Sequence, residues 1–150
     1  MLSEYLLAEM SRLGAQDALP LHRQLYEALR RAMLDGKLGA DTLTAGAGAD
    51  IFLFSSTLGS GNIDNVTDYA VADDVIQLDD AVFAGLTLGG LAANAFYIGA
   101  AAHDADDRII YNSATGALLF DADGNGAGAA VQFATLTTSL ALAAGEFVVV

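Results

Sequence analysis

The chain has 150 residues, a formal net charge of −13 and no cysteine. This length suits one domain with an appendage, and the lack of cysteine excludes both disulfides and thiolate metal sites. No apolar run approaches the roughly 18 residues of a membrane span, so we expect no stable insertion into a membrane.

The charge is distributed unevenly along the chain. Residues 1–40 are neutral, with five basic and five acidic groups, whereas residues 41–150 hold one basic residue against fourteen acidic ones. Such a surface repels nucleic-acid phosphates and attracts cations, so no nucleic-acid partner is expected. The carboxylates either solubilise the surface or include groups that need a cation to lie close together. The second interpretation is favoured for Asp41, Asp50, Asp121 and Asp123.

Residues 1–35 have the pattern of two helices. Ser3 suits an N-cap and Gly14 a helix end. Pro20 stands where a first helical turn accepts proline, and apolar residues then repeat at helical spacing from Leu21 to Ala32. We therefore expect a helical appendage over 1–35, followed by a separate domain over 36–150.

Two nine-residue blocks run back to back after the appendage. Residues 36–44 read GKLGADTLT and residues 45–53 read AGAGADIFL. Both fit the pattern G-G-x-G-x-D-x-U-x, with Lys37 and Ala45 as the departures. The glycines permit tight turns that aim carbonyl oxygens inward, and the aspartates add the hard oxygen that Ca²⁺ prefers. Leu43 and Phe52 are expected to begin short strands that face a core.

Further β-prone runs follow, separated by clusters of glycine and aspartate. A turn at 113–116 separates two of them, so residues 108–121 are expected to form a β-hairpin. Residues 79–91 fit either a short helix or a loop. The expected strands are Ile51–Phe54, Val75–Leu78, Phe96–Ile98, Arg108–Tyr111, Ala117–Phe120, Ala130–Phe133 and Glu146–Val150.

Residues 36–150 resemble the C-terminal domain of serralysin-type and other RTX exoproteins. The resemblance implies a mainly β fold, in which a short parallel β-roll that binds Ca²⁺ continues into an antiparallel β-sandwich-like module. Besides the two nonapeptides, the likeness is carried by DNVTDY at 64–69, DDVIQL at 73–78, RIIY at 108–111, TGAL at 115–118 and FDADGNG at 120–126.

The same resemblance implies a route of secretion. Members of this family leave the cell through a type I (ABC transporter) system, which reads an uncleaved C-terminal signal. That signal often consists of an acidic residue followed by several hydrophobic ones, and Glu146–Val150 has this form. The expectation is therefore a secreted, extracellular protein whose partner is the export machinery.

The resemblance also suggests the calcium ligands. In the family, each nonapeptide forms half a turn and ions lie between loops two repeats apart, so two blocks need a further partner, for which Asp64 and Asp68 are candidates. The alternative is that the repeats are turns without a strong site. Residues 121–126 match the start of an EF-hand loop, but Gln132 stands at position twelve, so they form either a tight acidic turn or a weak site. The candidate ligands are Gly36, Gly39, Asp41, Gly46, Gly48, Asp50, Asp64, Asp68, Asp121, Asp123 and Asn125.

A second, shorter resemblance lies in the appendage. Residues 19–38 are similar to the first helix of GntR-type winged-helix regulators, but the recognition helix, the wing and a basic face are missing. The appendage is therefore either a helical piece that packs on the β domain or the remnant of a gene fusion.

No catalytic constellation is present. The chain has no H-E-x-x-H, no G-x-S-x-G and no phosphate-binding loop. His22 and His103 are both expected to be ordinary surface histidines, although His103 stands in an acidic loop. The sequence predicts a non-enzymatic, Ca²⁺-binding secreted module. The alternatives are a small secreted binding or surface-attachment protein and a fragment of a GntR-like regulator, and the oligomeric state stays open.

Overall fold

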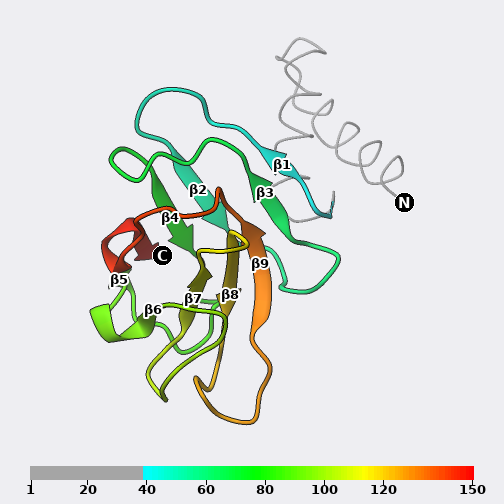
Figure 1. The fold of residues 1–150 in the computed structure, drawn as a ribbon, viewed down its shortest axis with the longest axis vertical. Coiled ribbons are helices and arrows are strands. Elements are labelled where there is room, and N and C mark those ends of the chain that lie inside the picture. Colours follow the sequence, from blue (N-terminus) through cyan, green and yellow to red (C-terminus); the bar gives the residue numbers. More distant parts are fainter. Residues whose placement is uncertain (1–38) are drawn as a thin grey trace, which may run out of the picture.

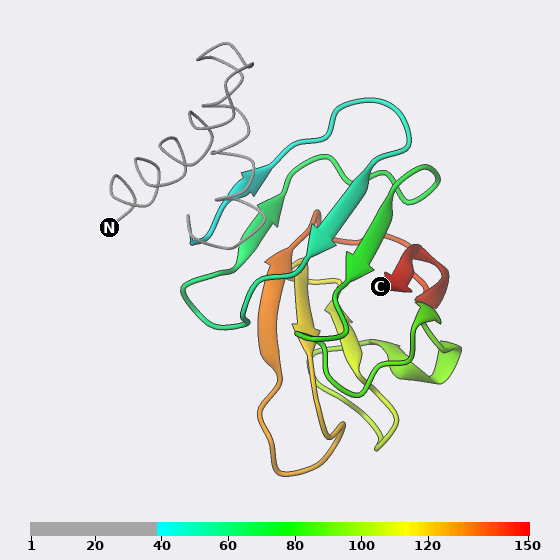
Figure 2. The same cartoon turned by 180° about the vertical axis from the view of Figure 1, so that it is seen from behind.

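The computed structural model describes residues 39–150. The expected helical appendage over 1–35 and the GntR-like segment over 19–38 lie outside this range. Within it, the chain is mainly β and contains two short 3-10 helices but no α-helix. The strands form two sheets, each of which mixes parallel and antiparallel pairs (Figures 1 and 2).

Six strands make the larger sheet and four make the smaller one. The 3-10 helices η1 (Ala93–Ala95) and η2 (Ala144–Glu146) directly precede β6 and β10. The larger sheet has the order β1 (Thr42–Leu43), β3 (Asp64–Val66), β9 (Val131–Thr135), β8 (Ala117–Phe120), β7 (Ile109–Asn112) and β6 (Phe96–Ile98). The smaller sheet has the order β2 (Ile51–Phe54), β4 (Val75–Leu78), β10 (Phe147–Val149) and β5 (Gly89–Gly90).

The first four strands alternate between the two sheets. β1 and β3 pair in parallel in the larger sheet, and β2 and β4 pair in parallel in the smaller one. Asp41 contacts Asp64, 23 residues later, beside β1 and β3, and Asp50 contacts Asp74, 24 residues later, beside β2 and β4. Residues 39–54 and residues 55–78 therefore each contribute one strand to either sheet.

The hairpin expected over residues 108–121 is confirmed, because β7 and β8 pair antiparallel. Gly116 turns the chain there with a φ of +80°, a conformation that glycine adopts without strain. The seven expected strands all form, four with the expected bounds and three with bounds that shift by one or two residues. β3 and β5 were not expected, and residues 79–91 contain turns and β5 rather than a helix.

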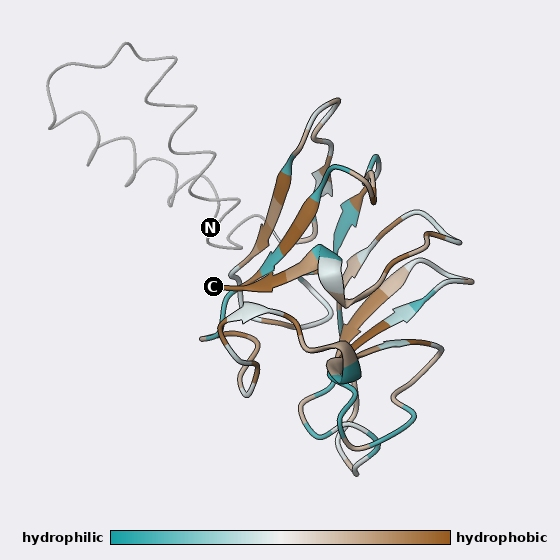
Figure 3. Ribbon diagram, turned by 90° about the vertical axis from the view of Figure 1, so that its left-hand side faces the viewer, coloured by the Kyte–Doolittle hydropathy of each residue, from teal (hydrophilic) through white to brown (hydrophobic). Residues whose placement is uncertain are grey.

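One hydrophobic core joins the two sheets. Phe54 of β2 meets Phe133 of β9 edge to face, with ring centroids 5.1 Å apart. Phe83, from the segment between β4 and β5, contacts the same Phe133 at 5.0 Å and is fully buried. Leu43 packs against this core and Phe52 lies in it, as expected from the nonapeptide pattern. Figure 3 shows hydrophobic residues gathered in strands and hydrophilic ones mainly in the loops.

The strand β10 lies inside the smaller sheet rather than at its edge. It pairs in parallel with β4 and antiparallel with β5. Phe147 and Val149 are buried, at 0% and 2% exposed, whereas Val150 is 43% exposed. Most of the segment Glu146–Val150 is therefore a central strand of this sheet, with Phe147 and Val149 in the core.

Candidate metal site

The nonapeptide turns depend on glycines with positive φ. Gly39, Gly46 and Gly48 have φ values of +81°, +97° and +128°. Residues with a Cβ rarely adopt this conformation, so these positions favour glycine. Gly36 lies outside the described residues.

The first aspartate of the repeats stacks on an aspartate of the next turn. Asp41 directly precedes β1 and Asp64 begins β3, and the backbone N–H of Asp41 donates to Oδ1 of Asp64 at 3.0 Å. Gly39 lies close to the same turn, since a Cβ placed on it would be 3.2 Å from the carbonyl oxygen of Gly61. We call the pair Asp41 and Asp64 the first stack.

Both carboxylates of the first stack have raised pKa values. Burial raises the pKa of Asp41. Burial also raises the pKa of Asp64, the charge of Asp41 raises it further, and the hydrogen bond from the Asp41 N–H partly opposes both effects. Both shifts mean that the folded state disfavours the ionised form of each carboxylate. A bound cation would reduce this free-energy cost.

The loop 44–50 lies on the loop 67–74 of the next turn, and we call these two loops the second stack. The N–H groups of Ala45 and Gly46 donate to the two carboxylate oxygens of Asp68, at 3.1 and 2.7 Å. The N–H of Asp50 donates to Oδ1 of Asp74 at 3.0 Å, which repeats the arrangement of the first stack. Asp74 is 4% exposed, and its Oδ2 accepts the N–H of Ala70 at 2.8 Å.

One oxygen of the second stack has no partner. Asp50 Oδ2 is buried, and within residues 39–150 it is the buried side-chain polar atom that makes no hydrogen bond. A buried carboxylate oxygen that lacks hydrogen bonds is expensive, and an ion or ordered water is the usual explanation for such an atom. A carboxylate oxygen is a hard ligand, which suits Ca²⁺ better than softer metals.

Tyr69 connects the second stack to the C-terminal segment. Its hydroxyl donates to the carbonyl oxygen of Asp74 at 3.0 Å. Burial, followed by the charges of Glu146 and Asp74, raises the pKa of Tyr69.

The loop 121–126 connects β8 to β9, so strands flank it as expected. Asp121 is 4% exposed and its Oδ1 accepts the N–H of Asp123 at 3.2 Å. Oδ2 of Asp123 accepts the N–H of Gly128 at 3.0 Å, and this bond lowers the pKa of Asp123. Asn125 donates through its side chain to the carbonyl oxygen of His103 at 3.4 Å. These bonds account for a tight acidic turn without an ion.

The structure thus brings together several of the sequence-predicted residues. Asp64 faces Asp41, and Asp68 receives the N–H of Gly46. Asp74 was not among the candidates, although it holds the N–H of Asp50. The signal for it was available, because the pattern D-x-U occurs at 41–43, 50–52, 64–66 and 74–76, at or directly before the start of each of the first four strands.

No family model, curated protein or solved structure matches this chain. Among residues 39–150, no helix is long and apolar enough to cross a membrane.

Proposed function

We propose that residues 36–150 form a non-catalytic, Ca²⁺-binding module of RTX type that folds on Ca²⁺ outside the cell. β1 to β4 make a short parallel β-roll, and β6 to β9 belong to a sandwich-like remainder. The alternation of β1 to β4 between two sheets supports the first assignment. The resemblance of the sequence to RTX exoproteins supports extracellular function and type I export.

The unpartnered Oδ2 of Asp50 is the observation that carries this proposal. It lies in the second stack, where the nonapeptide pattern and the aspartate-to-aspartate contact both recur. A carboxylate offers about four lone-pair positions, so oxygens that already accept an N–H retain capacity for an ion. Ca²⁺ between the loops would use Asp50 and the carbonyl groups of the glycine turns.

The electrostatics of the stacks make folding depend on the ion. Fourteen acidic residues stand against Arg108 in residues 41–150, and the stacks bring several of them together. Where free Ca²⁺ is scarce, as in the cytosol, this repulsion opposes folding. Outside the cell, binding to the folded state alone adds about 1.4 kcal/mol for each site when free Ca²⁺ is roughly tenfold above Kd.

The position of β10 connects folding to export. Phe147 and Val149 are buried between β4 and β5, so an export signal at 146–150 would be accessible only before the smaller sheet forms. A fold that is less stable at low Ca²⁺ opens more often, which keeps this segment available. Export then precedes folding, and the ion stabilises the product outside.

Calcium titration by calorimetry tests the proposal. We expect binding in the wild-type protein and a strong loss of affinity in Asp50→Asn, which retains the size of the side chain. The matched control is Asp80→Asn, an exposed aspartate outside the stacks, and this variant should bind as wild type does. Equal Ca²⁺ affinity in Asp50→Asn and Asp80→Asn would refute a site at the second stack.

A further inference from the structure

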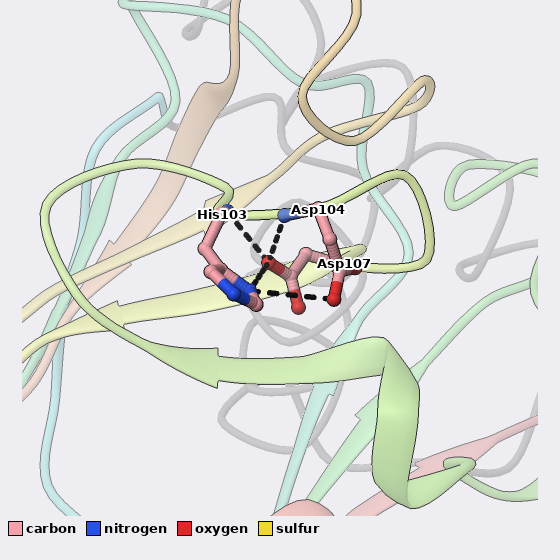
Figure 4. Close-up of side chains that lie close together, drawn as sticks. All are labelled: His103, Asp104 and Asp107. Carbon is pink, nitrogen blue, oxygen red and sulfur yellow. Dashed lines mark hydrogen bonds and ion pairs between the residues drawn. The ribbon is translucent and has the colours of Figure 1, made fainter.

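A second group of metal-binding side chains lies in the loop between β6 and β7, apart from the nonapeptide turns. His103 Nδ1 is 3.3 Å from Oδ2 of Asp104 and 3.6 Å from Oδ2 of Asp107. One ligand atom from each of the three residues lies within 4.8 Å of the others. Figure 4 shows the imidazole and both carboxylates turned toward one another.

Hydrogen bonds within the loop hold the three side chains in place, with their ligand atoms close to one another. Oδ2 of Asp107 accepts the N–H groups of His103 and Asp104, at 2.6 and 3.0 Å. Oδ1 of Asp104 accepts the N–H of Asp106 at 2.9 Å, which leaves Oδ2 toward the imidazole. The ring of His103 stacks on Tyr97 with centroids 5.0 Å apart and an interplanar angle of 18°. Hydrogen bonds of this kind orient metal ligands before the metal arrives.

Among residues 39–150, the ion pair of the buried Asp107 carboxylate is with His103 and not with a lysine or arginine. Asp107 is 3% exposed, and Arg108 is the sole Lys or Arg within residues 39–150. Nη1 of Arg108 donates to the carbonyl oxygens of Ala105 and Asp107, and the ion pairs found in the described part of the chain are those of His103. A divalent cation bound to Oδ2 would place positive charge beside this buried carboxylate.

We propose that His103, Asp104 and Asp107 bind a divalent transition-metal ion of the Zn²⁺ class. Bonds of about 2.0–2.2 Å in a tetrahedral arrangement place neighbouring ligand atoms roughly 3.3–3.6 Å apart, which agrees with both distances from Nδ1. The imidazole nitrogen favours such a metal over Ca²⁺, which takes six to eight oxygen ligands. The side chains of His103 and Asp104 are 61% and 51% exposed. The fourth coordination position of the metal would therefore be open to water.

The site is independent of the proposed calcium stacks, and the test separates the two. Zn²⁺ binding is measured by calorimetry at neutral pH in saturating Ca²⁺, and Co²⁺ absorption reports the geometry of the ligands. We expect one equivalent of Zn²⁺ and a Co²⁺ spectrum typical of four-coordinate geometry. His103→Ala should weaken Zn²⁺ binding at least tenfold. His22→Ala, which removes the other histidine of the chain, is the matched control and should leave the affinity unchanged.

Asp104→Asn provides a second variant, because this exposed side chain can lose its charge while it still accepts the N–H of Asp106. It should also weaken Zn²⁺ binding, and circular dichroism confirms that each variant is folded. The proposal is wrong if wild-type protein binds no Zn²⁺, or if both variants bind it as tightly as wild type. Binding that is lost in His22→Ala would equally overturn it.

Discussion

At the scale of single residues, Asp64 combines two opposing effects. Its Oδ1 accepts the N–H of Asp41, which stabilises the turn, while burial and the charge of Asp41 raise its pKa. Asp64→Asn keeps an acceptor oxygen and removes the repulsion. In EGTA we expect this variant to be more stable than wild type by about 0.2–1 kcal/mol, the range of surface charge pairs. In Ca²⁺ it should be the less stable of the two, which thermal melting in both conditions will show.

The same residue predicts a pH dependence. A raised pKa in the folded state means that the folded state holds the proton more tightly than the unfolded state, whose ordinary value is 3.8. The favourable contribution of protonation is complete below 3.8 and is lost as the pH rises through the folded pKa. In EGTA, the advantage of Asp64→Asn over wild type should therefore shrink as the pH falls from neutral toward 3.8. An advantage that stays constant over this range would show that the charge of Asp64 is not its cause.

At the scale of secondary-structure elements, β10 is the strand on which the smaller sheet most clearly depends. Phe147 is fully buried, and its ring meets that of Phe96 with centroids 5.3 Å apart. Phe147→Ala should cost about 3–5 kcal/mol in the free energy of unfolding, because it leaves a cavity between the sheets. Val150→Ala, at a half-exposed position of the same segment, should change it by less than about 0.5 kcal/mol. Urea denaturation in Ca²⁺ measures both, and equal effects would contradict the central role of β10.

The elements also show what the sequence can and cannot predict. Strands with β-branched or aromatic residues in alternation, such as Ile51–Phe54 and Val75–Leu78, were predicted with their observed bounds. Asp64–Val66 was missed because Asp64 and Asn65 have weak strand preference, and it forms through pairing with β1 and β9. Tertiary pairing also explains Asp74: its contact with Asp50 spans 24 residues, whereas two nonapeptides cover eighteen, so repeat spacing alone did not align them.

His103 illustrates a further limit of sequence reasoning. Its spacing to Asp104 and Asp107 is that of an ordinary acidic loop, and we expected a lone surface histidine. The loop turns so that the N–H groups of His103 and Asp104 both reach Asp107, and this turn brings the imidazole against the carboxylates. Backbone geometry of this kind is not encoded in a local residue pattern.

At the scale of the whole molecule, charge and fold are coupled. The net charge of −13 acts against compaction, while a single core joins the two sheets and favours it. If diffuse repulsion alone opposed folding, concentrated NaCl would stabilise the protein as well as Ca²⁺ does, since salt screens exposed charges. We expect NaCl to raise the melting temperature of the EGTA-treated protein only slightly, because screening does not place a divalent cation at the Asp50 carboxylate. Melting in NaCl with EGTA, compared with Ca²⁺ at low salt, checks this.

The most direct test is far-UV circular dichroism with thermal melting, in EGTA and then in millimolar Ca²⁺, with Mg²⁺ as the control. A Ca²⁺-specific gain in β signal, with a melting temperature higher by about 5 °C or more, is the predicted result, because a domain of this size gains several degrees for each kcal/mol. Identical spectra and melting curves in EGTA and Ca²⁺ would contradict the account. The two stacks would then be turns held by their own hydrogen bonds, and the domain would fold on its apolar core alone.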